Sequence, residues 1–271
     1  MTMDEGQHGP KETWANGAVY EPYMGRWSRL VARKFLNWLD VSPNCYWLDV
    51  GCGTGALSRT ILDLAAPAHV KGFDRSDDYV VFAREQVRDE LAQFEVGDAQ
   101  ALPVETGTYD AVVSGLALNF IPEPRQAVAE MTRAAKPTSV VAAYVWDYAG
   151  KMQLMRHFWD AAAALDSRAH DLDEGRRFPI CQPLPLRELF QSTGLSDVAV
   201  RPIDIATDFQ DFDDYWSPFL GGQAPAPAYA RSLSDEQRAV LRERIRAGLP
   251  FAQDGSISLT ARAWAVRGFR Q

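Results

Sequence analysis

An apolar run that ends in three closely spaced glycines constrains this chain more than any other stretch. Residues 47–57 read WLDVGCGTGAL, with the glycines at Gly51, Gly53 and Gly55. Glycine lets the backbone turn tightly and leaves no side chain between the turn and a ligand. A helical apolar pattern starts at once at Ala56, so the first N–H groups of a helix should point at the same spot. The pattern predicts a strand, a turn and a helix that together bind a nucleotide-like cofactor.

The acidic residue before this turn separates two classes of cofactor. Residues 51–56 satisfy the G-x-G-x-x-G/A pattern of dinucleotide folds, in which the turn holds a pyrophosphate. Asp49 stands just before the first glycine, where its carboxylate would repel such an anion. A cofactor with an amino group and no phosphate suits Asp49 better, and S-adenosylmethionine carries both an ammonium and a sulfonium. A glycine-rich turn without a ligand is the remaining alternative.

Residues 49–55, DVGCGTG, resemble the first motif of the class I S-adenosylmethionine-dependent methyltransferases. Within that class, the resemblance is to the small-molecule enzymes related to ubiquinone and menaquinone biosynthesis. It covers residues 45–146 with specific motifs and the rest of the chain more loosely. It implies that Gly51, Cys52 and Gly53 contact the cofactor together with Asp49.

A second acidic residue ends the next predicted strand. Asp74 lies about 20 residues beyond the turn, the spacing at which a βαβ unit brings a carboxylate to the ribose hydroxyls. We expect Asp74 to lie at the ribose and the adjacent Arg75 also to bind the cofactor. Ser76, Asp77 and Asp78 follow as a capping hydroxyl and two first-turn acids, which favours a helix start over a ligand role for the two acids.

The segment after a third predicted strand carries another resemblance. Residues 97–103, GDAQALP, are similar to the family motif G-D-A-x-x-L-P. This implies that Asp98 accepts a hydrogen bond from the adenine amino group and that the backbone N–H of Ala99 meets a ring nitrogen; for Asp98 a simple turn role is the alternative. A fourth strand is predicted over residues 109–120, and its end, from Ser114 onward, should face the transferred methyl group.

The residues before the first strand show helical spacing of apolar side chains, with Phe35, Leu36 and Leu39 on one face. Many small-molecule methyltransferases of this type have an N-terminal element that closes over the cofactor. The resemblance implies that Tyr20 and Arg26 reach the methionine half, because a guanidinium can pair with a carboxylate. A solvated arginine on an amphipathic helix is the alternative.

Alternating strands and helices up to residue 146 predict a parallel, doubly wound sheet. Residues 198–206 and 257–266 alternate as two further strands, similar to the antiparallel pair that ends the family's sheet. The predicted fold class is therefore α/β, a doubly wound Rossmann-like sheet of seven strands, mostly parallel with one antiparallel C-terminal strand, carrying helical cap insertions. The predicted divisions are an N-terminal cofactor-covering segment (1–44), the S-adenosylmethionine-binding core (45–147), a cap insertion (148–185), core (186–206), a second cap insertion (207–252) and a C-terminal core strand (253–271).

The two predicted insertions are rich in aromatic residues and leave the sheet on its ligand side. We expect four of these rings to contact the substrate, with core packing as the alternative: Trp159, Tyr215, Trp216 and Phe219. Methyl transfer from a sulfonium needs alignment more than acid–base groups, and no catalytic motif stands out. The catalytic residues are left unknown, with three weak candidates for a base, each equally open to a structural role: His157, Asn119 and Tyr148.

Composition narrows the partners. The net charge of -8 argues against a nucleic-acid partner, and a neutral or apolar small molecule is expected as methyl acceptor. The three scattered cysteines and four histidines show no metal-ligand spacing and suit a reducing cytoplasm. No apolar run is long enough to span a membrane, and the start of the chain lacks the features of a signal peptide.

The sequence predicts a cytoplasmic S-adenosylmethionine-dependent methyltransferase. Two alternatives are a non-catalytic S-adenosylmethionine-binding protein and, less favoured, an NAD-dependent oxidoreductase. Asp49 and the Asp98-Ala99 segment weigh against the oxidoreductase, as does the lack of a Tyr-x-x-x-Lys or similar set for hydride chemistry.

Overall fold

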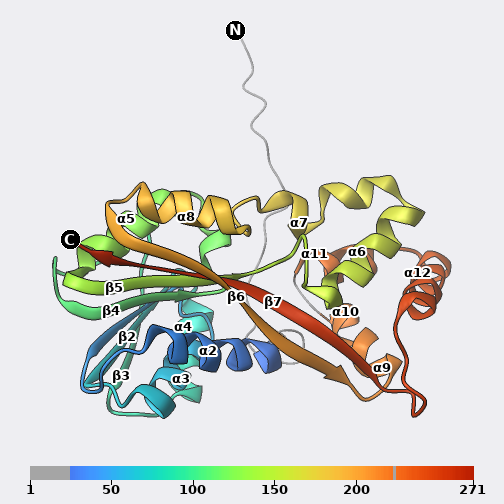
Figure 1. The fold of residues 1–271 in the computed structure, drawn as a ribbon. Coiled ribbons are helices and arrows are strands. Elements are labelled where there is room, and N and C mark those ends of the chain that lie inside the picture. Colours follow the sequence, from blue (N-terminus) through green and yellow to red (C-terminus); the bar gives the residue numbers. More distant parts are fainter. Residues whose placement is uncertain (1–24, 222–223) are drawn as a thin grey trace, which may run out of the picture.

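In the computed structural model, which describes residues 25–221 and 224–271, seven strands form one sheet in the order β3-β2-β1-β4-β5-β7-β6 (Figure 1). The strands are β1 (Tyr46–Val50), β2 (His69–Asp74), β3 (Ala92–Val96), β4 (Tyr109–Gly115), β5 (Ala135–Trp146), β6 (Leu195–Phe209) and β7 (Ile257–Arg270). β7 runs antiparallel to both β5 and β6, and the other neighbouring pairs are parallel. The predicted sheet is confirmed.

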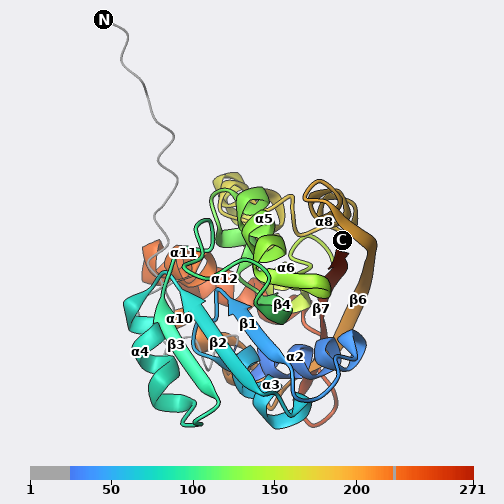
Figure 2. The ribbon, with the colours of Figure 1, turned by 90° about the vertical axis from the view of Figure 1, so that its left-hand side faces the viewer.

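The carboxyl-terminal parts of the central strands are mostly apolar because both faces of the sheet are covered there. The last four residues of β1 and the last seven of β5 are all buried, as expected for parallel strands between two helical layers. Helices α2 (Arg26–Leu39), α3 (Ala56–Ala65) and α4 (Asp77–Gln86) lie on one face, and α5 (Pro124–Ala134) and α8 (Pro183–Gln191) lie on the other (Figures 1 and 2).

Helix boundaries follow local chemistry. The Ser76 hydroxyl caps α4 by accepting a hydrogen bond from the Tyr79 N–H. Asp77 and Asp78 occupy the first turn of α4, where negative charges interact favourably with the positive end of the helix dipole. α5 begins at Pro124 and ends before Pro137, because proline fits the first helical turn and interrupts the helix interior.

The remaining helices gather at one end of the sheet, beside the long ends of β6 and β7 (Figure 1). They are α6 (Gln153–Leu165), α7 (Glu174–Arg177), α9 (Phe212–Trp216), α10 (Pro218–Gly221), α11 (Pro225–Ser232) and α12 (Asp235–Gly248). β5 ends at Trp146, opposite Ala263 of β7, so residues 257–262 of β7 continue past it. This places these helices on the side of the sheet where the parallel strands end.

Some strand boundaries differ from the prediction. β4 ends at Gly115 rather than at residue 120, because Leu116 adopts a left-handed backbone (φ 59°) that breaks the extended run. A short 3-10 turn, η2 (Leu118–Phe120), follows. β6 and β7 are both longer than predicted, since they pair with each other beyond the range in which their apolar alternation is regular. None of the helices described is both long and apolar enough to cross a membrane.

Candidate active site

The glycine turn at the end of β1 is shaped by close neighbours as well as by backbone freedom. Gly51, Gly53 and Gly55 all have positive φ angles, which side chains disfavour. A Cβ on Gly51 would lie 2.5 Å from the Cβ of Ala117, and one on Gly55 would lie 2.9 Å from a methyl of Val87. A Cβ on Gly53 would meet nothing within 4 Å. Gly53 is therefore the glycine of the turn that leaves open space for a ligand.

Asp49, two positions before the turn, is a buried carboxylate with one oxygen free. It is 0% exposed, and its Oδ2 accepts a hydrogen bond from the Ser58 hydroxyl at 2.7 Å. Its Oδ1 is buried and has no partner among the residues that the structure describes. Burial raises the pKa of Asp49 to about 7, against the lowering effect of the Ser58 bonds. A cationic ligand group would satisfy the free oxygen and favour the charged form.

Asp74 joins the end of β2 to the glycine turn. Its Oδ2 accepts from the Gly53 N–H and its Oδ1 from the Ser76 N–H, both at 2.9 Å. Burial raises the pKa of Asp74, while these backbone bonds and the exposed Arg75 lower it. The two carboxylates, Asp49 and Asp74, therefore stand on either side of the turn. The buried Cys52 thiol lies between them in sequence, and burial raises its pKa well above the usual value.

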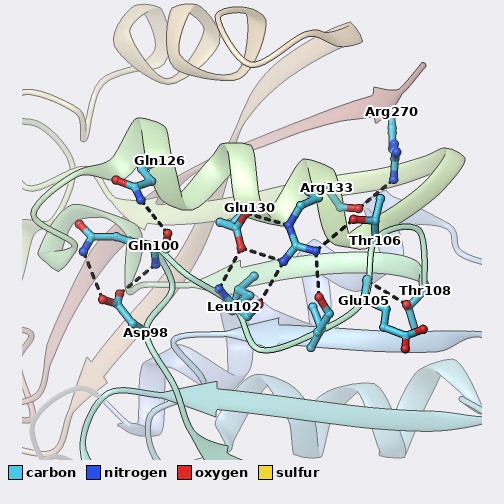
Figure 3. A network of polar contacts seen from close by, with 11 residues as sticks. Asp98, Gln100, Leu102, Glu105, Thr106, Thr108, Gln126, Glu130, Arg133 and Arg270 are labelled. Carbon is cyan, nitrogen blue, oxygen red and sulfur yellow. Dashed lines mark hydrogen bonds and ion pairs between the residues drawn. The ribbon is translucent and has the colours of Figure 1, made fainter.

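The loop after β3 holds Asp98 at the surface. Its Oδ1 accepts from the Gln100 N–H at 2.9 Å and its Oδ2 from the Gln100 side-chain amide at 3.4 Å, and the residue is exposed. Ala99 packs partly against the core. Figure 3 shows how this loop is fixed to α5: Gln126 donates to the Gln100 carbonyl, and Glu130 accepts from the Leu102 N–H, each at 2.9 Å.

Arg133 completes that attachment. Its guanidinium pairs with Glu130 at 2.8 Å and donates to the carbonyls of Leu102 and Val104 at 3.0 and 2.8 Å (Figure 3). Hydrogen bonds to Glu130 hold the pKa of the Arg133 guanidinium above its usual value. The loop that carries Asp98 is thus held in place by protein contacts alone.

The end of β4 adds two further buried polar side chains. Ser114 is fully buried, and within the described ranges its hydroxyl has no partner. Asn119, in η2, is 8% exposed, and both atoms of its amide are buried and unpaired in the part of the chain that the structure describes. Since Val113 pairs with Asp49 in the sheet, these groups belong to the same edge. Buried polar atoms are usually paired, so this edge has the chemistry of a ligand site.

Arg26, at the start of α2, lies among residues of the second predicted insertion. Its Nη1 pairs with the Asp214 carboxylate at 2.9 Å. Its guanidinium carbon lies 4.4 Å from the ring centre of Trp27 and 4.9 Å from that of Phe209. Its Nε and Nη2 are buried and have no hydrogen-bond partner in residues 25–221 and 224–271. Tyr20 lies outside the described residues.

The four rings predicted to contact substrate are brought together. We call Trp159, Tyr215, Trp216 and Phe219, with Phe158 and Phe212, the cap aromatic cluster; its members are all buried. Phe219 stacks on Phe158 with ring centres 4.6 Å apart, and Trp216 lies nearly parallel to Phe212 at 6.4 Å. The Tyr215 hydroxyl donates to the Leu154 carbonyl at 2.8 Å, and the Trp159 indole donates to Glu174. Their predicted contact with substrate stays a prediction.

The other two candidate bases are His157 and Tyr148. His157 is half-buried on α6, where burial lowers its pKa against the opposing effect of Asp160. Tyr148 is buried, with its ring 6.1 Å from that of Phe178. Within the described ranges, no group of three or more His, Cys, Asp or Glu side chains lies close enough to hold a metal ion.

Sequence reasoning missed two partners at this site. Ser58 sits inside a predicted helix and gave no signal beyond its spacing from Asp49, while Asp214 looks like an ordinary helix-start acid. A buried strand aspartate requires a donor, so the hydroxyl facing it from the next helix was the available clue to Ser58. Asp214 is 188 residues from Arg26, and local pattern does not link them.

Comparison with known proteins agrees with this geometry. Residues 48–143 match the family described as a methyltransferase domain. Over 103 residues the chain is 36% identical to demethylmenaquinone methyltransferase from Bacillus cytotoxicus, a match that covers 36% of this chain and 44% of that protein. A 37.1 kDa uncharacterized protein of a Streptomyces fradiae transposon is 35% identical over 104 residues, which covers 38% of this chain and 30% of that protein. The chain thus matches less than half the length of these relatives.

Solved structures share the fold over nearly the whole chain. A chain from the complex of the Haloferax volcanii Trm112 methyltransferase activator with a putative methyltransferase has a TM-score of 0.59 at 22% identity, covering 95% of this chain and 96% of that one. Phosphoethanolamine N-methyltransferase 2 of Haemonchus contortus, in complex with S-adenosyl-L-methionine, has a TM-score of 0.60 at 16% identity, covering 93% and 56%. The domain match and the relatives show a methyltransferase domain over residues 48–143, within a seven-stranded sheet whose fold is shared with solved methyltransferase structures.

Proposed function

We propose that this protein transfers a methyl group from S-adenosylmethionine to a small molecule. The observation that carries the proposal is Asp49: a fully buried carboxylate, beside a glycine turn, with one oxygen unpaired among the described residues. A buried anion there would repel a pyrophosphate and would be stabilised by the ammonium of a methionine moiety. The same feature disfavours a nicotinamide cofactor.

The other polar groups fit the remaining parts of that cofactor. Asp74 keeps lone pairs for the ribose hydroxyls while it holds the turn through Gly53. The exposed carboxylate of Asp98 and the backbone of Ala99 would meet the adenine ring, on a loop already fixed to α5. Arg26 presents Nε and Nη2 to the methionine carboxylate. Ser114, Gly51 and Cys52 line the position between these ends.

The bound cofactor would supply a methyl group that is already activated on a sulfonium. The protein then has to orient the acceptor for in-line displacement and exclude water, and orientation alone can lower the barrier by several kcal/mol, up to about 7–11. Asn119 is suited to this because an amide can accept from and donate to an acceptor group, although it is too weak a base to remove its proton. An acceptor with an acidic proton would need a base, for which His157 and Tyr148 stay candidates.

For the acceptor we infer a small, neutral or apolar molecule. The cap aromatic cluster gives this end of the sheet an apolar interior, although its rings are buried against one another, and the net charge of -8 disfavours a polyanion. Helices α6, α7 and α9–α12 would form a cap over the edge of the sheet where the acceptor binds. Fold alone does not fix this activity, since the solved structure of the [4+2]-cyclase SpnF also resembles the chain, with a TM-score of 0.52 at 18% identity over 97% of this chain and 84% of that one.

Calorimetry tests the cofactor. S-adenosylhomocysteine should bind the purified protein with a dissociation constant near micromolar, about -8 kcal/mol, and NAD and NADP should not bind measurably. Tight NAD binding without S-adenosylhomocysteine binding would overturn the proposal.

A second measurement separates an enzyme from a protein that only binds the cofactor. Methyl transfer to a panel of phenols, amines and quinols would be followed by S-adenosylhomocysteine release, with Trp216→Ala as the test variant. If the cluster contacts the acceptor, this variant loses transfer and keeps its S-adenosylhomocysteine affinity. A large loss of thermal stability with full activity at low temperature would instead make Trp216 a core residue.

A further inference from the structure

The guanidinium of Arg26 has one edge occupied and one edge open. Nη1 is held by Asp214 Oδ1 at 2.9 Å. Nε and Nη2 form the other edge, which is buried and unpaired within the part of the chain that the structure describes. Two parallel N–H groups on one edge match the two oxygens of a carboxylate better than any other common ligand group. The open edge is therefore a preformed half of a bidentate pair.

Aromatic rings restrict the movement of this guanidinium. Its carbon lies 4.4 Å from the Trp27 ring centre and 4.9 Å from that of Phe209, and the two rings meet edge-on at 5.6 Å. Contacts with rings favour a cation at their faces and limit its translation. They do not choose which edge of the guanidinium points outward. That choice is made by the acid that binds Nη1.

The acid that makes this choice belongs to the second predicted insertion. Asp214 is in the first turn of α9, and its N–H donates to the Asp211 carboxylate at 2.9 Å. Its own Oδ2 accepts from the Gln210 N–H at 3.1 Å. The carboxylate is thus also held by the backbone just before α9. Both side chains of the pair are about one-third exposed, and such pairs contribute little to folding stability.

We propose that Asp214 is a positioning residue through which α9 directs the open edge of Arg26 toward the methionine carboxylate of the cofactor. This rests on the proposed function, because the carboxylate is that of S-adenosylmethionine. The arrangement makes α9 part of the cofactor site although the residue does not contact the cofactor. The coupling is reciprocal: if the Asp214–Arg26 pair raises the affinity for the cofactor by a certain factor, bound cofactor strengthens that pair by the same factor.

The chain offers a matched control on the same turn of helix. Asp213 also lies in the first turn of α9 and pairs with an arginine, Arg242, at 2.9 Å. Asp214→Asn and Asp213→Asn therefore remove the same charge from the same helix end, and each breaks one ion pair. The asparagine in Asp214→Asn can still accept from the Gln210 N–H. Only Asp214→Asn loosens Arg26.

The test compares two ligands by calorimetry, S-adenosylhomocysteine and 5′-methylthioadenosine, which keeps the adenosine and lacks the amino acid. Asp214→Asn should weaken S-adenosylhomocysteine about tenfold, the effect of one charge-assisted hydrogen bond, and leave 5′-methylthioadenosine unchanged. Asp213→Asn should change neither. Arg26→Gln should cost more, about 10- to 100-fold, and adding Asp214→Asn to it should cost nothing further.

Three results with the variants would overturn the proposal. They are equal losses for both ligands, equal effects of the two aspartate variants, and additive effects of Arg26→Gln and Asp214→Asn. Thermal melts of each variant show whether a loss of affinity reflects loss of fold. If the wild-type protein binds 5′-methylthioadenosine and S-adenosylhomocysteine equally, Arg26 holds no cofactor carboxylate. If it binds neither, the proposed function itself has failed.

Discussion

Two buried carboxylates of this protein have similarly raised pKa values but differ in whether their oxygens have hydrogen-bond partners. Burial raises the pKa of Asp49, in β1, and of Glu174, in α7, to about 7 in each case. Glu174 accepts from the Trp159 indole, and neither of its oxygens is left buried and unpaired within the described ranges. Asp49 has a free buried oxygen, and Ser114 and Asn119 near it are unpaired in the same residues.

The comparison separates a structural polar group from one that awaits a ligand. A raised pKa alone marks both sites, because it reports burial. Pairing distinguishes them, since an unpaired buried polar atom costs about 1–3 kcal/mol and folding by itself gives no reason to keep it. The edge at β1 and β4 therefore has the character of a binding site, and the contacts of Glu174 have the character of a core.

Replacing Asp49 should have the largest effect on cofactor affinity. Asp49→Asn keeps the shape and the Ser58 hydrogen bond, and removes the charge that meets the ammonium. S-adenosylhomocysteine affinity should fall about 100-fold or more, the effect of removing one member of a buried charge pair. Calorimetry measures this, with Glu174→Gln as the matched variant that should bind normally. Similar losses in both variants would mean that pairing does not distinguish the two sites.

Asp74 is expected to have the next largest effect. Asp74→Ala removes acceptors for the ribose hydroxyls and releases the Gly53 N–H. A lost charged hydrogen bond costs about 1.5–3 kcal/mol, which is a 10- to 100-fold loss of S-adenosylhomocysteine affinity. Asp77→Ala should change the affinity little, because Asp77 lies in the first turn of α4. Equal losses in the two variants would contradict the placement of Asp74 at the ribose.

The pH dependence of binding tests the role of Asp49 further. The ammonium of S-adenosylhomocysteine requires charged Asp49, whose pKa of about 7 makes protonation compete below neutrality. The dissociation constant should therefore rise up to about tenfold per pH unit below pH 7 and level off above it. Asp49→Asn should abolish this slope, and 5′-methylthioadenosine, which has no ammonium, should not show it. A slope that persists in Asp49→Asn would assign it to another group.

The raised pKa of Asp49 affects folding stability in the opposite direction to ligand affinity as the pH rises. A carboxyl whose folded pKa is raised from 3.8 to about 7 stabilises the folded state below pH 3.8, and this contribution is lost as the pH rises to 7. Glu174 contributes a loss of the same sign. The contribution of Asp49 to the free energy of unfolding without ligand should thus decline over this range while ligand affinity increases. Urea titrations of the wild type and of Asp49→Asn at several pH values isolate this contribution, because carboxyls with lowered pKa values, such as Asp204, contribute with the opposite sign.

The smallest effect belongs to the cap aromatic cluster. Tyr215→Phe removes one hydrogen bond, to the Leu154 carbonyl, and should lower the free energy of unfolding by about 0.5–1.5 kcal/mol. S-adenosylhomocysteine affinity should stay unchanged because the hydroxyl is already paired inside the protein. Urea unfolding and calorimetry measure the two quantities. If the variant has normal stability and weakened binding, Tyr215 contributes to the ligand site and not to folding stability.

Periodicity and spacing were enough to predict the parallel strands, the glycine turn, Asp74 at the end of β2 and the Ser76 cap, because each follows from neighbours close in sequence. The antiparallel pair at the end of the sheet was implied by the resemblance to the family. The end of β4 was not predictable in this way. Leu116 turns left-handed where the glycine turn packs against Ala117, a contact between distant segments. The Arg26–Asp214 pair and the mutual packing of the aromatic rings depend equally on tertiary structure, so the sequence supplied the residue types without their partners.

The three glycines of the turn are needed for different reasons. Gly51 and Gly55 are required by Ala117 and Val87, which leave no room for a side chain, whereas Gly53 has no protein neighbour in the way. A relative that lost its cofactor would still need the first and last glycine to fold. Its middle glycine, in the left-handed region that asparagine and aspartate tolerate, would be the first to drift. In such a family, the middle position records whether the cofactor is still in use.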